Sequence, residues 1–321
     1  MDKKTKYRKH CIQEVKIPIF SQAWWLDAVA GKDNWDVVII EKGGLVVASM
    51  PYVFQKRFGQ IKLRQPPLTQ TLGPWIREVD GKQASRLSRE KDLLEQLIAA
   101  LPRYDDFNQS WHFSQTNWLP FYWAGFTQTT RYTYRLPDIS NQDMLWRGLR
   151  ENIKREIRKA KKRYSLKVHT DKSIEVFLDL HIKTFKRQGK DKLNAKNLIM
   201  RLNDACENKN ARKIFIAQDA EGKSYAGVYL VWDQQSAYYL MGGSEPNLRT
   251  SGAISLCLWE AIKFASTVTK SFDFEGSMKE TIERHFRAFG AKQTMYFSVN
   301  HTPSKLIRTV NFVRDILKYK N

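Results

Sequence analysis

The chain has few cysteines, no long apolar run and a deficit of acidic residues, and each shortage excludes a class of protein. Its three cysteines, Cys11, Cys206 and Cys257, show neither a Cys-x-x-Cys pair nor Cys/His ligand spacing. This favours a reducing compartment and argues against structural zinc. No apolar stretch approaches the roughly 20 residues that a membrane-spanning helix needs. The charged N-terminus, MDKKTKYRKHC, lacks the apolar core of a signal peptide. We therefore expect a cytoplasmic protein.

Motifs for metal binding and for nucleotide hydrolysis are also missing. The six histidines show no metal-ligand spacing, and none lies near a Cys or Ser in a triad-like pattern. No Walker-type GxxxxGK sequence occurs, so ATP hydrolysis is unsupported. We expect no bound metal.

Basic residues outnumber acidic ones by 54 to 33, which gives a formal net charge of +21. This excess is larger than solubility requires and predicts a polyanionic partner or surface, with phosphate groups as the default. Apolar residues are plentiful, because 42% of the chain is hydrophobic and 12% is aromatic. The composition is that of a globular protein, and the length of 321 residues suggests two domains.

The two halves of the chain repeat the same order of predicted elements. Each half contains two apolar runs joined by a short turn, which predicts a β-hairpin at 37–54 and again at 213–232. A glycine turn, an amphipathic helix, a strand and a short aromatic helical piece that runs into a last strand follow in both halves. These elements are expected at 72–74, 87–101, 107–115 and from 121, and again at 241–243, 253–265, 271–275 and from 286. The shared order indicates a duplicated domain, with domains at 1–140 and 141–321.

Positive charge is densest where the second domain opens. Residues 147–163, RGLRENIKREIRKAKKR, combine apolar residues at helical spacing with a mostly basic remainder. Glu156 lies three residues before Lys159, a spacing that favours a local pair. The helix is either a solvated connector or a cationic surface that holds a phosphorylated acceptor, a nucleotide or an RNA backbone. In the second case Arg155 and Arg158 are the binding candidates.

Three stretches together resemble a known family. They are the helix IKREIRKAKKRY, the GG turn followed by SGAISLCLWEAIKFA, and FDFEGS followed by FRAFG. The layout, from about Gln13 to Lys318, resembles the FemAB-like branch of the GNAT acyltransferase superfamily, which includes the BioF-type acetyltransferase domain and the peptidoglycan bridge-forming aminoacyltransferases. The resemblance implies an α+β fold of two GNAT-like domains, each a mixed, mostly antiparallel sheet flanked by helices.

The resemblance also implies a chemistry, the transfer of an acyl group from a carrier to an amine. In the bridge-forming enzymes the carrier is aminoacyl-tRNA and the acceptor is the amine of a peptidoglycan precursor, whereas many other GNAT proteins use acyl-CoA. Both carriers are anionic and suit a basic protein. The chain lacks a long paired-helix insertion that would act as a separate tRNA-binding arm, so the donor stays open between acyl-CoA and aminoacyl-tRNA.

GNAT domains usually carry an Arg/Gln-x-x-Gly-x-Gly/Ala turn whose amides meet a pyrophosphate at a helix N-terminus. Residues 247–254 read NLRTSGAI, in which Arg249 and Gly252 match the pattern and Ile254 departs from it. The segment is either a phosphate cradle or an ordinary helix start capped by Ser251. The departure weakens the case for CoA.

In the bridge-forming enzymes a phenylalanine-lysine pair before an FG turn supplies a cation to the reaction centre. Phe286 and Arg287 resemble that pair, with arginine in place of lysine. An arginine can stabilise an oxyanion or bind a carrier, but it cannot shed a proton. The alternative is a surface arginine on a helix whose phenylalanines point inward.

Two carboxylates end the strand of FDFEGS just before a glycine. Asp273 and Glu275 share one face of this strand and are placed to bind or deprotonate an amine. We expect Asp273 to anchor the acceptor amine, with Glu275 as the second candidate. The alternative is a solvent-facing acidic pair.

The strand around 238–243, YYLMGG, is the second part of the predicted site. The resemblance implies that backbone amides beside a splayed strand meet the oxyanion, which assigns Gly242 and Gly243 to substrate binding. If the resemblance holds, Tyr239 is an acid or a substrate contact. The alternative is that Tyr239 is an aromatic residue of the hydrophobic core.

The sequence thus predicts an amine N-acyltransferase whose active site lies in the second domain. The alternative is a non-catalytic RNA-binding protein on a degenerate GNAT fold. A lipid-linked cell-wall precursor is one candidate acceptor. The segment 305–321, with Ser304 as its cap, reads as a basic amphipathic helix that either packs on the protein or touches the inner membrane face.

Overall fold

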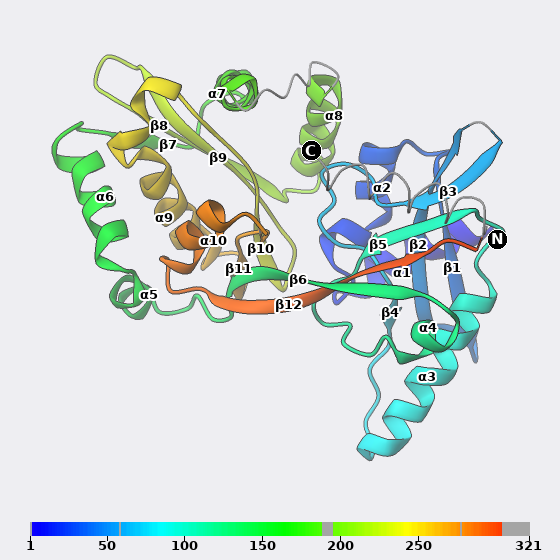
Figure 1. Cartoon of the computed structure of the whole chain (residues 1–321). Helices are drawn as coiled ribbons and strands as arrows, with labels where there is room; N and C mark the ends of the chain where they lie inside the picture. The colour runs from blue at the N-terminus through cyan, green and yellow to red at the C-terminus, as the bar shows by residue number, and fades with distance from the viewer. Residues whose placement is uncertain (1, 58, 188–194, 277, 304–321) are drawn as a thin grey trace, which may run out of the picture. The chain divides into compact units, whose positions relative to one another are not determined.

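The computed structural model describes residues 2–57, 59–187, 195–276 and 278–303. The described chain forms two compact units. Unit 1 contains residues up to Arg131 together with 295–303, and unit 2 contains Tyr132–Thr294. Each unit is a mixed, mostly antiparallel sheet flanked by helices, so the expected fold class is confirmed (Figure 1).

The elements of unit 1 follow the first predicted repeat. Its strands are β1 (Trp35–Lys42), β2 (Leu45–Arg57), β3 (Gln60–Arg64), β4 (Trp75–Ile76) and β5 (Asp106–Ser110). Its helices are α1 (Lys3–Gln13), the 3-10 turn η1 (Ile19–Ser21), α2 (Ala23–Ala30), α3 (Gln83–Ala99) and α4 (Leu119–Trp123). Gly43 and Gly44 both have positive φ, of 57° and 77°, which is the backbone that a tight β1–β2 hairpin turn requires.

The elements of unit 2 follow the second repeat. Its strands are β7 (Lys167–His169), β8 (Arg212–Gln218), β9 (Ser224–Trp232), β10 (Ser236–Ser244) and β11 (Ser271–Asp273). Its helices are α5 (Gln142–Gly148), α6 (Glu151–Lys162), α7 (Ile174–Arg187), α8 (Ala195–Asn208), the 3-10 turn η2 (Pro246–Ser251), α9 (Ala253–Ala265) and α10 (Glu280–Arg287). Two further strands, β6 (Thr127–Leu136) and β12 (Lys292–His301), run across the boundaries between the units.

Both sheets have the same strand order and the same sequence of orientations. Unit 1 reads β1-β2-β3-β5-β12, and unit 2 reads β8-β9-β10-β11-β6 with β7 added outside β8. In each sheet the first two pairings are antiparallel, the third is parallel and the fourth is antiparallel. The predicted duplication is therefore confirmed at the level of strand pairing.

The last strand of each sheet comes from the other half of the sequence. Residues 298–301 of β12 pair with β5, and residues 135–136 of β6 pair with β11. The compact units therefore divide the chain differently from the domains 1–140 and 141–321, which stay a sequence-based prediction. Apolar alternation predicts that a segment is a strand, but it does not say which sheet edge the strand joins.

Helices α6 and α9 form one side of the core of unit 2 (Figure 1). Helix α9 is apolar around most of its circumference and buries nine of its thirteen residues, as a helix that is hydrophobic on all sides must. In α6 the buried residues are Ile153, Ile157 and Ala160, which confirms the predicted apolar stripe and leaves the basic face outward. The predicted helix 147–163 is not continuous, because the backbone is extended at Leu149 and Arg150 between α5 and α6. Successive side chains of β9 point to opposite faces of the sheet. One face packs against α6 and α9, and on the other face Gly227 lies against Phe177 of α7.

Within the described ranges, no helix has the length and apolar character that a membrane span requires. The predicted helix 305–321 and its cap Ser304 lie outside the described residues.

Candidate active site

The site lies in unit 2, where two parallel strands diverge. Strands β10 and β11 pair over three residues, from Ser236 with Ser271 to Tyr238 with Asp273. Beyond Tyr238, β10 continues to Ser244, with a bulge between Tyr239 and Met241. A bulge bends the strand and re-aims its side chains. The divergence therefore brings the ends of two strands together with the turn that follows β11.

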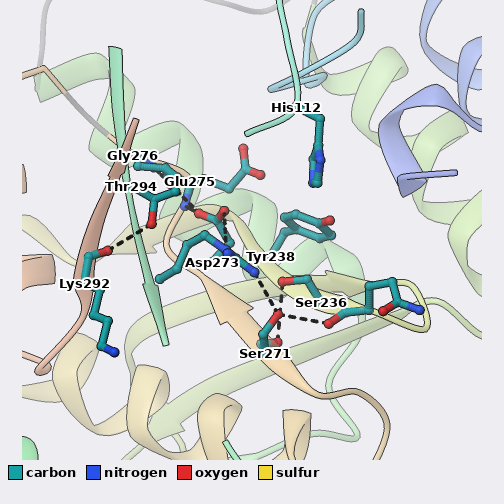
Figure 2. A network of polar contacts seen from close by, with 12 residues as sticks. His112, Ser236, Tyr238, Ser271, Asp273, Glu275, Gly276, Lys292 and Thr294 are labelled. Atoms are coloured by element: carbon teal, nitrogen blue, oxygen red, sulfur yellow. Dashed lines mark hydrogen bonds and ion pairs between the residues drawn. The ribbon is translucent and has the colours of Figure 1, made fainter. Parts of the chain in front are cut away.

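Asp273 lies inside this turn and holds it together. Its side chain is buried, with the residue only 4% exposed. Its Oδ1 accepts hydrogen bonds from the Thr133 hydroxyl and from the Glu275 amide, the latter at 2.8 Å, while Arg135 Nε lies 3.7 Å from Oδ2. The Thr133 oxygen in turn accepts from the Gly276 amide at 3.0 Å. Figure 2 shows Asp273 among these polar contacts. Asp273 therefore positions the turn.

Burial raises the pKa of Asp273 to about 6, although the Thr133 and Glu275 hydrogen bonds and the Arg135 charge all act in the lowering direction. The desolvation of a buried carboxylate exceeds the combined effect of its three partners. The expectation that Asp273 anchors the acceptor amine stays a prediction, and its contacts are those of a positioning residue.

Glu275 is the more accessible of the two carboxylates. The residue is partly exposed, and it has a φ of 58°, which non-glycine residues adopt rarely and at a cost. Gly276 holds the next position closely, because a Cβ there would lie 2.1 Å from the Tyr132 carbonyl oxygen. Dense packing around its carboxyl group, and the nearby Asp273 charge, raise the pKa of Glu275 well above its ordinary value. A base with a raised pKa in a strained turn is typical of functional sites.

Tyr239 lies at the bulge and packs against the core that contains α9, on the face of β10 opposite to Tyr238 and its partner Asp273. Its ring meets Phe286 edge-on, with centroids 5.9 Å apart. Its hydroxyl lies over Gly242, where a Cβ would be 1.9 Å from the tyrosine oxygen. The hydroxyl makes no hydrogen bond within the described residues, and burial raises the pKa of Tyr239, so it can donate a proton in a hydrogen bond and cannot act as a base near neutral pH.

Gly242 and Gly243, which the sequence assigns to substrate binding, lie where a larger residue would clash with its neighbours. Gly242 makes room for the Tyr239 hydroxyl. Gly243 makes room for α7, since a Cβ there would lie 2.5 Å from the His181 backbone nitrogen. Their assignment to substrate binding stays a prediction.

Arg287 lies on the surface of α10. Its Nε donates to Glu283 Oε1 at 2.7 Å, and the same oxygen accepts from the Tyr134 hydroxyl at 2.9 Å. Its neighbour Phe286 is buried and stacks on Phe274 with centroids 5.1 Å apart. The cation of Arg287 is therefore compensated by a residue of its own helix, and its predicted catalytic role remains untested.

The first turn of α9 already holds a carboxylate of this chain. Gly252, with a φ of 82°, is the N-cap of α9, and a Cβ there would lie 2.2 Å from the Glu156 carbonyl oxygen. The Ser255 hydroxyl donates to Glu156 Oε2 at 2.5 Å. Helix N-termini attract negative charge. The Glu156 carboxylate thus lies where the GNAT pattern would bring a pyrophosphate.

Sequence reasoning missed Glu156, because the spacing to Lys159 suggested a local pair. In the structure Lys159 Nζ instead donates to the Thr250 carbonyl at 2.6 Å, which joins α6 to η2. The expected cap Ser251 precedes the true N-cap, and its hydroxyl accepts from the Ala253 amide at 3.3 Å.

The three predicted phosphate-binding arginines lie on two elements in mutual contact, α6 and η2. Arg155, Arg158 and Arg249 are all exposed. Arg158 is paired with Glu151 at 2.7 Å. The structure thus places Arg249 on an element that packs against α6.

His285 lies next to Phe286 on α10. Its ring is half-buried beside Phe289, and its Nε2 has no hydrogen-bond partner among the described residues. Burial lowers the pKa of His285. No group of three or more His, Cys, Asp or Glu residues in the described ranges could hold a metal ion.

Residues 147–286 match the family model of an acetyltransferase (GNAT) domain. None of the curated proteins compared with the chain matches it.

Solved structures share the fold at low sequence identity. FemX is 12% identical with a TM-score of 0.67, and the match covers 92% of this chain and 96% of FemX. L-PGS from Bacillus licheniformis is 10% identical with a TM-score of 0.53, over 98% of this chain and 97% of L-PGS. A conserved protein of unknown function from Bacteroides thetaiotaomicron VPI-5482 is 11% identical with a TM-score of 0.54, over 92% and 96% of the two chains.

These likenesses show the fold, and the family model supports an acyltransferase. Residues 147–286 of unit 2 therefore resemble a GNAT-type acetyltransferase domain, and the fold shared with FemX and L-PGS is consistent with the predicted resemblance to FemAB-like members of the GNAT superfamily.

Proposed function

We propose that unit 2 transfers an aminoacyl group from aminoacyl-tRNA to an amine, at the point where β10 and β11 diverge. The observation that carries the choice of donor is the Glu156 carboxylate at the first turn of α9. The proposed acceptor is the amine of a cell-wall precursor, the class that the bridge-forming relatives use. A lipid-linked precursor would bring the protein to the inner membrane face.

Glu156 and Ile254 together disfavour CoA. Two unit charges of the same sign about 4 Å apart repel by about 4 kcal/mol at an effective dielectric constant of about 20. A pyrophosphate at the first turn of α9 would meet the Glu156 carboxylate, and Ile254 stands where close approach calls for glycine or alanine. The donor that remains, aminoacyl-tRNA, does not need a pyrophosphate cradle.

The exposed arginines of α6 and η2 suit an RNA backbone. They are Arg155, Arg158 and Arg249, and phosphate contacts by arginine and lysine supply most of the affinity of nonspecific nucleic-acid binding. Their contribution should weaken as salt rises, because binding releases counterions.

In the proposed reaction the acceptor amine attacks the ester carbonyl carbon of the aminoacyl group. Glu275 takes the proton from the attacking nitrogen, for which its raised pKa suits it. The amide bond forms, the ester bond to the ribose oxygen breaks, and the proton returns from Glu275 to that oxygen. Backbone amides of β10 beyond Tyr238, where β11 has diverged, donate to the developing oxyanion, as the resemblance implies. Asp273 and Thr133 keep Glu275 in place through its amide and that of Gly276.

The test measures both binding and transfer with the full chain. Calorimetric titrations with acetyl-CoA, charged tRNA and uncharged tRNA are run on the wild type and on Glu156→Ala, with Glu151→Ala as the control from the same helix. We expect salt-sensitive tRNA binding, no saturable acetyl-CoA binding by the wild type, and measurable acetyl-CoA binding only after Glu156→Ala. Arg249→Ala should weaken tRNA binding.

Transfer is then followed in a single turnover from labelled aminoacyl-tRNA to an amine acceptor. Saturable binding of acetyl-CoA to the wild type, with acetyl transfer, would contradict the proposed donor. Binding of tRNA without transfer to any amine acceptor would favour the alternative, a non-catalytic RNA-binding protein.

A further inference from the structure

A hollow in unit 2 lies away from the candidate active site. It has a volume of about 660 Å³ and is lined by residues of β7, β8, the end of α6 and the second half of α9. This volume lies within the range of small-molecule sites, about 300–1,000 Å³. None of the residues assigned above to catalysis or to binding of the acyl carrier lines it.

The walls of this hollow carry an excess of positive charge. Four lysines line it, Lys161, Lys167, Lys213 and Lys263, against a single acidic residue, Glu260. Glu260 is already bound on both oxygens, by Lys161 at 3.2 Å and by Lys263 at 2.5 Å.

Two of the lysines are left without an acidic partner. Lys167 is exposed and makes no ion pair with any described residue. Lys213 Nζ lies 4.2 Å from the centroid of the Phe264 ring, a cation–π contact that does not neutralise its charge. These two cations are therefore available to an anion in the hollow.

The rest of the lining is apolar. Leu166, Val168, Phe215, Leu256 and Phe264 contribute to it. Phe215 and Phe264 lie near each other, with ring centroids 5.9 Å apart. Apolar walls with a few convergent polar groups are the usual make-up of a small-molecule site. The lining thus suits a ligand with an apolar body and one anionic end.

We propose that this hollow binds a small organic anion, with its phosphate or carboxylate held by Lys213, its apolar body against Phe215 and Phe264, and Lys167 adding positive charge at the Gln218 end of β8. The proposal does not depend on the proposed acyl transfer. It requires only the described lining and the lack of an acidic partner for these two lysines.

The experiment titrates the full chain with 1-naphthyl phosphate in a calorimeter. Inorganic phosphate tests the anionic end alone, and 1-naphthol tests the apolar body alone. We expect one molecule of 1-naphthyl phosphate to bind per chain. Lys213→Ala should weaken binding about tenfold or more, since a hydrogen bond to a charged group contributes about that factor, and Lys167→Ala should weaken it less. Lys223→Ala, an exposed lysine in the turn between β8 and β9, is the matched control and should bind as the wild type does. Thermal melting of each variant checks that the fold is intact.

Several results would overturn the proposal. If inorganic phosphate binds as tightly as 1-naphthyl phosphate, the apolar walls contribute nothing to binding. If 1-naphthol binds as tightly, the lysines contribute nothing. Equal losses in Lys223→Ala and Lys213→Ala would show a general charge effect. A short RNA that displaces 1-naphthyl phosphate, and loses its own binding in Lys167→Ala and Lys213→Ala, would assign these lysines to an RNA surface.

Discussion

The two units share one strand order but differ where their parallel strands end. In unit 1, beyond the pairing of β3 with β5, Leu72 forms a bridge with Trp111, which is fully buried. Gly73 permits this closure, because a Cβ there would lie 2.5 Å from the Trp111 ring. In unit 2 the same region carries Asp273 and Glu275. One copy is closed by an aromatic side chain, and the other presents polar groups.

Under the proposed function, only one copy of the duplicated scaffold carries the active site. The match to the GNAT family model, residues 147–286, falls within unit 2. In unit 1 the equivalent region contributes to stability through packing. Substitutions in the two regions should therefore affect different properties, activity in unit 2 and stability in unit 1.

The largest expected effect is on activity, from Glu275→Gln. If Glu275 accepts the amine proton, its loss should slow transfer by about 10²–10⁴-fold, the usual contribution of a general base. The wild-type rate should rise with pH through the raised pKa of Glu275, and the variant should lose that dependence. Single-turnover transfer at several pH values measures both. Glu280→Gln, on the exposed start of α10, is the control, and an unchanged rate in Glu275→Gln would remove Glu275 from the mechanism.

The counterpart in unit 1 is Trp111→Ala. Removing a fully buried tryptophan side chain should lower the free energy of unfolding by about 3–5 kcal/mol. Denaturant unfolding measures this loss, and transfer per folded molecule should stay near that of the wild type. If Trp111→Ala stays folded and still loses transfer activity, the proposal that this region of unit 1 contributes only to stability is wrong.

A smaller effect is expected on the pH dependence of stability. Burial raises the pKa of Asp273 to about 6, while the unfolded carboxyl keeps its ordinary value of 3.8. Between these two pH values the folded state holds a proton that the unfolded state releases, so the contribution of Asp273 to stability falls as pH rises across this window. Asp273→Asn keeps an oxygen for Thr133 and for the Glu275 amide, and it should lack this fall. Denaturant unfolding of the wild type and of Asp273→Asn at pH values from 4 to 6 measures this difference. If the free energy of unfolding changes with pH in the same way for both proteins, the prediction is wrong.

The smallest effect is expected from Arg287→Ala. Arg287 is exposed and pairs with Glu283 one turn away on α10, and such pairs contribute about 0.3–0.5 kcal/mol. We expect a change in the free energy of unfolding of this size, weaker at high salt, and a transfer rate close to that of the wild type. A large fall in transfer, restored by Arg287→Lys, would instead support the catalytic cation that the family resemblance suggests.

Much of the fold could be predicted from the sequence. The hairpins, the apolar stripe of α6 and the buried helix α9 follow from patterns local to each segment, and the structure contains each of them. The partners of β6 and β12 could not be predicted, because alternation of side chains does not identify the neighbouring strand.

The candidate site was predictable only in part. The positions of Asp273 and Glu275 at a strand end are visible in the sequence, but their different exposure depends on Thr133, which lies far away along the chain. The contact of Glu156 with Ser255 likewise joins distant segments, and the nearby Lys159 suggested a different partner.

The exchange of β6 and β12 also has a consequence for synthesis of the protein. Residues 298–301 supply the edge of the sheet to which β5 belongs, so unit 1 lacks a strand until nearly all of the described chain has left the ribosome. Domains usually fold as units from the N-terminus during translation. Unit 1 can therefore complete its sheet only after unit 2 has been synthesised. Because the pairing of β12 with β5 joins residues that are far apart in the sequence, we expect this last folding step to be slow.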